Sequence, residues 1–437
     1  MSRVLLRGGC VLSLGVKTPN FPEADLLIED GRVAEIGRGL RARDAEVVDA
    51  TDGIIMPGFV DTHRHVWKSL FRNRGAVAPE IDTSHFQPDD VYAATLIGLL
   101  GAVEAGITTV VDWADIPVDD RYTEAALQAH ADAGLRTVFV HSTPGWSGTP
   151  VDIRASARRL AESRPHTPGS STTLAFGSVD LSRNHADRVE EEWALARQLG
   201  LRIHAHAGLQ ISDAGMVSKL AQEGLLAADV TLVHCSHLGE EDLDAIAENG
   251  ASVSLAPSSE MAGGLGAPPL QKFLNRRIQP GLAIDDERLA PGDIFAQMRL
   301  ANSVQHAAYF DLKLAGKAGL PNLLTTRDVI RYATVEGART VGLGDVTGSL
   351  EPGKQADIIV LRTDRPNIYP INDPIGAVVW GVDTSNLDWV FAGGRALMRN
   401  GKLEADVNRA RGLAGTAHDG VMAAAGLLAE TGAGHKL

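Results

Sequence analysis

Histidine and aspartate residues gather at the ends of apolar runs in this chain. The runs end in Asp61-Thr62-His63-Arg64-His65, His204-Ala205-His206, His234-Cys235-Ser236-His237 and Asp285-Asp286. The chain has 14 histidines among 437 residues, and six of them stand at three of these ends. Imidazole and carboxylate groups are the ligands that a zinc-like divalent ion takes in a catalytic site, so the pattern indicates metal chemistry.

The pair His63 and His65 could hold an ion because residues two apart on a strand point to the same face, with Cα atoms about 6.5–7 Å apart. An H-x-H pair by itself is also compatible with two hydrogen-bonded core histidines. The strand-five histidines and Asp285 favour the metal, because they stand at the same kind of strand end.

The middle of the chain must position these groups, and there apolar strand runs alternate with helical patterns. The eight candidate strands are GIIMPGFVDTH, TTVVDWAD, LRTVFVHS, TTLAFGSVD, LRIHAHAG, VTLVHCSH, ASVSLAPS and QPGLAIDD. Eight such units predict an α/β fold, a (β/α)8 TIM-type barrel, whose functional side chains project from the carboxyl ends of the strands. A doubly wound open sheet is the rival, but no G-x-G-x-x-G follows the first strand.

Both ends of the chain read as short strands with turns, such as Asp30-Gly31 and Asp52-Gly53. We therefore expect a small β-sandwich domain built from residues 1–53 and 351–410, and a barrel over residues 54–350. Residues 411–437 are rich in alanine and glycine with helical spacing, and predict a helical C-terminal tail that packs or mediates oligomer contacts.

The composition excludes several classes of function. A formal net charge of −14 argues against a nucleic-acid partner, which needs a concentrated positive field. Cys10 and Cys235 cannot form a disulfide framework, which fits a reducing compartment. The amino terminus lacks a signal-peptide pattern, and no apolar run approaches the ~18 residues of a membrane span. We expect a cytoplasmic protein that does not contact membranes.

Several segments resemble the amidohydrolase superfamily. PGFVDTHRH followed by VWKSLF resembles its first-strand signature. DDVYAATLIGLLGAVEAGITTVVDW is similar to the helix and second strand of its cytosine deaminase and triazine hydrolase branch, and LVHCSHL, SVSLAPSSEM, GLAIDD and GSLEPGKQADIIVL continue that pattern in order. The resemblance covers nearly the whole chain.

The resemblance implies a metal held by His63, His65, His206 and Asp285. Asp285 would also accept a proton from the attacking water. His234 would stand beside that water or the developing oxyanion, which makes it the second catalytic residue. His204 is the alternative ligand on strand five, and His237 is a weaker candidate on strand six.

The resemblance also bears on the number of ions. Relatives with two ions carry a modified lysine at the end of strand four, but TTLAFGSVDLSRN contains no lysine. This predicts one divalent ion, Zn²⁺ first, with Fe²⁺ or Mn²⁺ as alternatives. The resemblance further implies a small-molecule substrate and a homodimer.

Two positions depart from the pattern of the branch. Its deaminases carry a glutamate three residues after the metal histidine, and here that position is Leu209. Glu260 stands where asparagine is expected, at the end of strand seven. We hypothesise that Glu260 lies on the barrel rim as a third catalytic residue, either replacing the missing shuttle or binding a cationic part of the substrate. The alternative is a loop glutamate paired with an arginine.

The favoured function is hydrolysis of a non-peptide C–N bond in a small nitrogen-rich ring, as a deaminase or aminohydrolase acting through activated water. Loss of the glutamate leaves open an amide or cyclic-imide hydrolase, or a hydrolytic dehalogenase. From another class of protein, a non-catalytic barrel scaffold or binding protein remains, because a fold alone never establishes activity.

Overall fold

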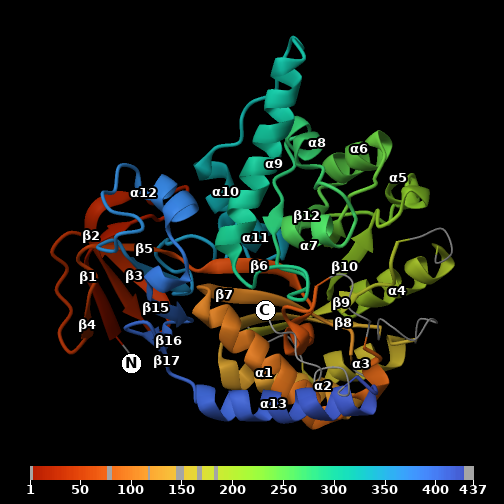
Figure 1. Cartoon of the computed structure of the whole chain (residues 1–437), viewed down its shortest axis with the longest axis horizontal. Coiled ribbons are helices and arrows are strands. Elements are labelled where there is room, and N and C mark those ends of the chain that lie inside the picture. Colours follow the sequence, from red (N-terminus) through yellow and green to blue (C-terminus); the bar gives the residue numbers. More distant parts are fainter. Residues whose placement is uncertain are drawn as a thin grey trace, which may run out of the picture.

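The fold comes from a computed structural model, which describes residues 3–75, 81–116, 119–143, 152–164, 170–181 and 186–427. Two sheets organise these residues, one of eight strands and one of nine. Figure 1 shows the nine-stranded sheet beside the eight-stranded one, which is surrounded by helices.

The eight-stranded sheet is the barrel. Its strands are all parallel and follow each other in chain order. They are β6 (Phe59–Arg64), β7 (Ile107–Ala114), β8 (Arg136–Ser142), β9 (Thr172–Gly177), β10 (Arg202–Ala207), β11 (Val230–His234), β12 (Ser252–Leu255) and β13 (Gly281–Leu282). A parallel bridge between Arg64 and Asp285 brings the last strand back to the first. The predicted eight-stranded barrel is confirmed.

The strands form because they are buried on both faces. Every residue of β7, ITTVVDWA, is buried, as are all residues of β6 and β8. Such strands read as continuous apolar and β-branched runs, because helices cover one face and the barrel interior the other. The carboxyl ends of all eight strands consequently open on one rim.

Helices connect the strands. The ones that follow the strands are α1 (Pro88–Glu104), α2 (Asp120–Ala133), α3 (Arg154–Ser163), α4 (Ala186–Gln198), α5 (Met216–Gln222), α6 (Glu240–Asn249), α7 (Pro257–Ala262), α8 (Leu270–Asn275), α9 (Ile294–Leu314), α10 (Thr326–Tyr332) and α11 (Val335–Thr340). Local signals set their ends: the Asp119 side chain accepts the Arg121 N–H to begin α2, and Gly134 ends it at φ +80°. Helix α9 projects away from the barrel (Figure 1).

The second sheet draws strands from both chain ends. Its members are β1 (Arg3–Val11), β2 (Phe21–Glu29), β3 (Arg32–Gly37), β4 (Glu46–Asp49), β5 (Gly53–Pro57), β14 (Ile358–Arg362), β15 (Leu387–Ala392), β16 (Arg395–Arg399) and β17 (Lys402–Leu403). The two halves join where β5 pairs antiparallel with β14. Leu6 and Leu26 of the first half share an apolar core with Ile358 and Phe391 of the second. The predicted β domain from both termini is confirmed.

The segment GIIMPGFVDTH was predicted as one barrel strand, and this prediction was wrong. It forms β5, which pairs with β1 and β14, and then β6 of the barrel. The change of sheet falls at Gly58, whose N–H bonds to the Asp357 carbonyl. A Cβ at Gly58 would stand 2.2 Å from the Thr108 side chain, so only glycine fits this crossing.

The C-terminal segment forms helix α13 (Val407–Ala424), which begins where the Asp406 side chain accepts the Arg409 N–H. It lies along α1 (Figure 1), and its Val421 belongs to the same apolar cluster as Phe71 of the short helix η1 (Val66–Phe71). The tail therefore packs on the barrel, while residues 428–437 lie outside the described residues. Short turns of helix complete the fold at η2 (Thr83–His85), η4 (Ile211–Asp213), α12 (Pro374–Gly376), η5 (Ala377–Gly381) and η6 (Thr384–Asn386).

Among the described helices, none combines the length and apolar character that a bilayer crossing requires.

Candidate metal centre

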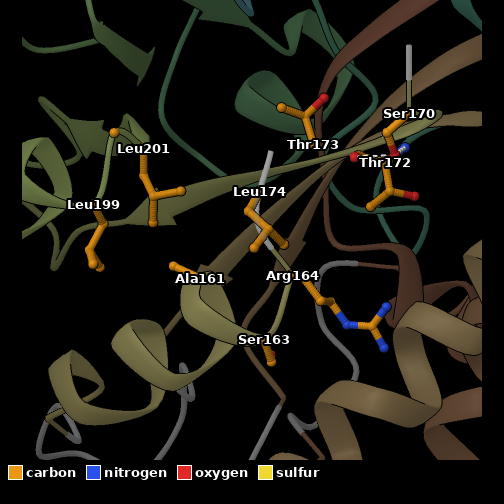
Figure 2. Close-up of a pocket in the computed structure, with 10 residues that line it drawn as sticks. Ala161, Ser163, Arg164, Ser170, Thr172, Thr173, Leu174, Leu199 and Leu201 are labelled. Carbon is orange, nitrogen blue, oxygen red and sulfur yellow. Dashed lines mark hydrogen bonds between the residues drawn. The ribbon is translucent and has the colours of Figure 1, made fainter. Parts of the chain in front are cut away.

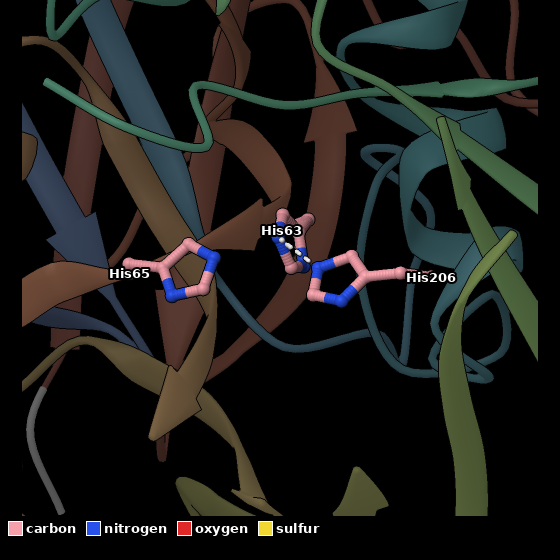
Figure 3. A group of neighbouring side chains, drawn as sticks. All are labelled: His63, His65 and His206. Atoms are coloured by element: carbon pink, nitrogen blue, oxygen red, sulfur yellow. Dashed lines mark hydrogen bonds between the residues drawn. The ribbon is translucent and has the colours of Figure 1, made fainter. Parts of the chain in front are cut away.

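The histidines and the aspartate singled out in the sequence converge on the carboxyl rim of the barrel. His63 Nε2 lies 3.3 Å from His206 Nε2, and Asp285 Oδ1 lies 3.4 Å and 3.5 Å from the Nε2 atoms of His63 and His65. Two groups have donor atoms within 4.8 Å of one another: His63 with His65 and His206, and His63 with His234 and Asp285. Figure 3 shows the rings of the first group facing a common space.

Backbone pairing places Asp285 against β6. Its N–H bonds to the His63 carbonyl at 2.9 Å, and its carbonyl accepts the His65 N–H at 3.0 Å. Asp285 has φ +65°, a left-handed conformation that is costly for residues other than glycine. This turn leaves the carboxylate beside the two histidines that its backbone contacts.

Three of the histidines have their outer ring nitrogen next to a carboxylate. The distances from Nδ1 to oxygen are 3.0 Å for His65 and Asp115, 2.9 Å for His206 and Asp180, and 3.2 Å for His234 and Glu260. A carboxylate that accepts the Nδ1 proton leaves the Nε2 lone pair for the centre of the site, as is usual for metal-binding histidines.

The donor set fits a divalent ion. Two Nε2 atoms 3.3 Å apart repel each other through their lone pairs unless a proton or a cation lies between them. Burial lowers the pKa of His63 and of His206, which keeps these imidazoles in the neutral, ligating form. Burial acts to raise the pKa of Asp285, but the hydrogen bond with His63 and the nearby histidines outweigh it and hold this pKa well below its usual range. Imidazole nitrogens with one carboxylate suit zinc or iron(II).

His204 does not join either group of donors. It is fully buried on β10, two residues before His206. Its two ring nitrogens have no hydrogen-bond partner among the described residues, and burial lowers its pKa to about 3. Of the two strand-five candidates, His206 is therefore the one that reaches the donor group. His237 is also outside both groups.

Trp113, at the end of β7, forms an aromatic wall beside the site. Its ring centroid lies 4.3 Å from that of His206 and 5.4 Å from that of His63, and its side chain is buried. The indole therefore packs against two imidazole rings of the site.

Glu260 does not lie on the open rim of the barrel, where the hypothesis placed it. It is fully buried in the first turn of α7, with Oε1 3.2 Å from His234 Nδ1 and accepting the Ala256 N–H at 2.8 Å. Its carboxylate contacts a site histidine, and no arginine of the described residues lies within ion-pair distance of it. Leu209, half-buried after β10, offers no carboxylate in its place.

A buried ionic network lies behind the site, and the sequence pattern did not predict it. Arg64, between the two strand-one histidines, is fully buried, and its guanidinium lies 2.9 Å from Glu287 and 3.5 Å from Asp61. Arg72 and Ser69 also bond to Glu287. Glu287 follows Asp285-Asp286 directly, so the position of an acid just after strand eight was the available signal. The network ties β6 to the segment that carries Asp285.

Replacing Glu287 by glutamine is expected to lower the free energy of unfolding by about 3–5 kcal/mol at pH 7, because it leaves the Arg64 charge undercompensated in a buried setting. Burial acts to raise the pKa of Glu287, but Arg64 and Arg72 outweigh it and hold this pKa at about 2, below the ordinary 4.5. The folded state thus favours the ionised form, so this stabilisation is present above pH 4.5 and is lost as the pH falls toward 2. Urea unfolding of both proteins at pH 7 and pH 3 measures the difference. A gap that does not shrink at pH 3 contradicts the assignment.

A cavity of about 380 Å³ lies at the opposite end of the strands (Figure 2). Its walls include Thr172, the first residue of β9, and Leu201, the residue before β10. The amino ends of barrel strands serve stability rather than chemistry, and none of the residues of the metal centre lines this cavity.

A parallel barrel whose strands end in clustered imidazole and carboxylate donors is the arrangement of a metal-dependent hydrolase. Comparison with known proteins agrees with this class. The sequence profile of the Amidohydrolase family matches residues 54–397. The chain belongs to the amidohydrolase family, and it is an enzyme of the hydrolase class.

Two curated relatives extend over almost the whole chain. The 5'-deoxyadenosine deaminase of Methanothermobacter thermautotrophicus is 29% identical over 425 residues, which cover 92% of this chain and 94% of the relative. The 5-methylthioadenosine/S-adenosylhomocysteine deaminase of Desulfitobacterium hafniense is 27% identical, with 92% and 95% covered.

Solved structures share the fold. An adenosine deaminase from Xanthomonas campestris with bound zinc superposes with a TM-score of 0.81 at 19% identity, covering 97% of this chain and 99% of that one. The atrazine chlorohydrolase from Arthrobacter aurescens TC1 complexed with zinc has a TM-score of 0.82 at 22% identity, covering 95% and 100%. The barrel with its companion β domain is therefore an architecture that these zinc-bound proteins also adopt.

Proposed function

We propose that this protein is an aminohydrolase that removes an exocyclic amino group or amine from a small nitrogen-rich heterocycle, using one divalent ion. The observation that carries the proposal is that the donor atoms of His63, His65 and His206 lie within 4.8 Å of one another, as do those of His63, His234 and Asp285. Asp285 Oδ1 also lies 3.5 Å from His65 Nε2. A scaffold or binding protein has no use for this set of donors together.

The ion would be held by the Nε2 atoms of the three histidines and by Asp285, and zinc is the first candidate. When bound there, it supplies a water molecule with a pKa near 7, about nine units below bulk water. Segment 172–184, which begins with β9, contains no lysine that could bridge a second ion. We therefore infer one ion per chain.

The side chains of the site then divide the proton handling. Asp285 Oδ1 is the acceptor for the proton of the attacking water, while Ser259 donates a hydrogen bond to Oδ2 and holds the carboxylate in place. A donor atom of His234 lies within 4.8 Å of Asp285, and His234 is suited to donate to the oxygen that gains charge once its Nε2 carries a proton. Asp285 then passes this proton on toward the leaving nitrogen, which is the general acid–base work of the reaction.

The substrate class follows from the relatives, whose names describe deamination of adenosine derivatives. Leu209 favours a second candidate, because a hydrophobic side chain at this position cannot protonate a ring nitrogen. Displacement of a halide needs no proton on the leaving group, so hydrolytic dehalogenation of a similar ring is the alternative, followed by amide or cyclic-imide hydrolysis.

A substrate panel decides between these activities. The zinc-loaded protein is incubated with adenosine derivatives, pterins, pyrimidines, amino- and chloro-substituted triazines and a cyclic imide, and ammonia, amine, halide and acid release are measured. We expect ammonia or amine from at least one amino-substituted ring, and none after treatment with a chelator. Release of halide or acid alone would move the function to the second candidate. No turnover of any kind, in protein that binds no metal, would favour the scaffold.

We also propose that the protein works as a homodimer in the cytoplasm. The support is the relationship to the family and the use of only two cysteines, Cys10 and the buried Cys235, neither of which is in a disulfide. Light scattering at micromolar concentration tests the dimer, with a mass of about twice 46.3 kDa expected.

A further inference from the structure

The turn of helix that follows β12 lies directly behind the reacting groups. In α7, two successive side chains reach the two residues that we propose to handle protons: Ser259 donates to Asp285 Oδ2, and Glu260 Oε1 stands 3.2 Å from His234 Nδ1. The departure of Glu260 from the pattern of the branch therefore falls next to the proton-handling groups and not in a remote loop.

Glu260 differs from the other carboxylates that contact site histidines. Asp180, beside His206, has a side chain that is 53% exposed, and Asp115, beside His65, also accepts a hydrogen bond from the Trp67 indole. Glu260 is fully buried, and within the described part of the chain no lysine or arginine lies within ion-pair distance of it.

A buried carboxylate without a cationic partner is costly unless a neighbour shares its charge or its proton. The two groups in contact with Glu260 Oε1 are the Ala256 N–H and the His234 ring. Its second oxygen, Oε2, has no hydrogen-bond partner among the described residues. Among the described residues, the His234 ring is thus the side chain that the Glu260 carboxylate contacts.

We propose that Glu260 is a positioning residue for His234, a proposal that rests on the proposed function. Glu260 holds the proton of His234 on Nδ1, turns Nε2 toward Asp285 and His63, and stabilises the positive charge when Nε2 carries a second proton. In this way the pair Glu260–His234 takes over the proton delivery that Leu209 cannot perform.

The step is balanced with water alone. The attacking water forms the C–O bond and gives one proton to Asp285, which passes it to His234 Nε2. The C–N bond breaks, and the proton on Nε2 goes to the leaving nitrogen, so that amine or ammonia departs and the hydroxyl oxygen remains on the ring. Glu260 neither gains nor loses a proton over the cycle. Its charge lowers the energy of the state in which His234 is cationic.

The kinetic test compares two buried glutamates. Glu260→Gln keeps the volume and removes the charge, and we expect kcat to fall about 10–100-fold with KM within about threefold and zinc content unchanged. Glu192→Gln is the matched control: Glu192 is also fully buried, but its carboxylate bonds to the Val179 N–H and Arg188 and touches no site histidine. Its kcat should stay within about threefold of the parent value.

A spectroscopic readout separates this proposal from the proposed function. In the zinc-loaded parent labelled with ¹⁵N-histidine, the His234 ring should carry its proton on Nδ1, at a strongly downfield position, with the assignment taken from His234→Asn. In the Glu260→Gln variant this proton should move upfield. A parent His234 protonated on Nε2 alone, or an unchanged signal in the variant, overturns the positioning role whatever the substrate. A normal kcat in Glu260→Gln also overturns the positioning role. The same holds if kcat falls equally in Glu192→Gln, or if the fall of kcat in Glu260→Gln is matched by a loss of bound zinc. Absence of turnover with the expected NMR signals overturns only the proposed function.

Discussion

Asp285→Asn is expected to lower kcat by about a thousandfold, within the range of 10²–10⁴ that general acid–base catalysis contributes. Asparagine has the size of aspartate, but it cannot accept the proton of the attacking water and pass it on. It also removes the negative charge from a position 3.4 Å from His63 and 3.5 Å from His65. Steady-state kinetics of ammonia release with the best substrate of the panel measure the loss.

The neighbouring residue gives a matched control. Asp286 bonds to Arg288 and lies 3.4 Å from Lys68, in the same segment but outside both donor groups. Asp286→Asn should therefore keep kcat within about tenfold of the parent, which is less than 1.4 kcal/mol in the barrier. Equal losses in the two variants would show that the segment as a whole matters, and that Asp285 has no separate role in catalysis.

The second large effect concerns the metal. His206→Asn is expected to weaken zinc binding by more than about a hundredfold, because a lost ligand costs more than a lost outer hydrogen bond, which alone costs 10–100-fold. Activity should vanish at zinc concentrations that saturate the parent protein. Zinc affinity is measured by competition with a chromophoric chelator, and zinc content by elemental analysis after gel filtration.

His204→Asn is the control for this variant, because His204 lies two residues earlier on the same strand with a fully buried ring. The same substitution there should leave one zinc per chain, since His204 belongs to neither donor group. If His204→Asn loses the metal and His206→Asn keeps it, the two histidines must exchange roles, and the strand-five ligand proposed here is wrong.

The barrel and its rim could be predicted from the sequence because their physics is local. A parallel strand buried on both faces is a continuous apolar run, and side chains that act together follow such runs at their carboxyl ends. His63, His65 and His206 obey both rules, so their proximity followed from the order of the strands. Asp285 obeyed them too, although β13 is only two residues long and Asp285 pairs with Arg64 through a single bridge.

The change of sheet between β5 and β6 and the buried ion pairs of Arg64 could not be predicted, because both depend on tertiary packing. β5 and β6 form one stretch around Gly58 that is buried throughout, and nothing in its periodicity shows that the two strands belong to different sheets. Arg64 reads as a surface residue by type, since arginine is rarely buried without a partner. Its partner Asp61 lies three residues away, but Glu287 is distant in the sequence and reaches Arg64 because the barrel closes.

For Glu260, the sequence predicts the position along the chain but not the group that the side chain contacts. The sequence placed it near the chemistry, since it follows strand seven by a few residues, but not the direction of its side chain. Helix α7 has only six residues, and a shift of one position would rotate the Glu260 side chain by about 100° around the helix axis, away from His234. The distinction between a group that meets the substrate and one that acts on a histidine is therefore a matter of tertiary packing.

The proposed hydrolytic activity depends on one divalent ion bound by His63, His65, His206 and Asp285. Anomalous X-ray diffraction at the zinc edge, from crystals of the zinc-loaded protein, tests this claim most directly. We predict a single peak per chain, about 2.0–2.2 Å from the Nε2 atoms of the three histidines and from a carboxylate oxygen of Asp285. A peak held by other residues, two peaks at this rim, or no peak in protein that turns over substrate would contradict it.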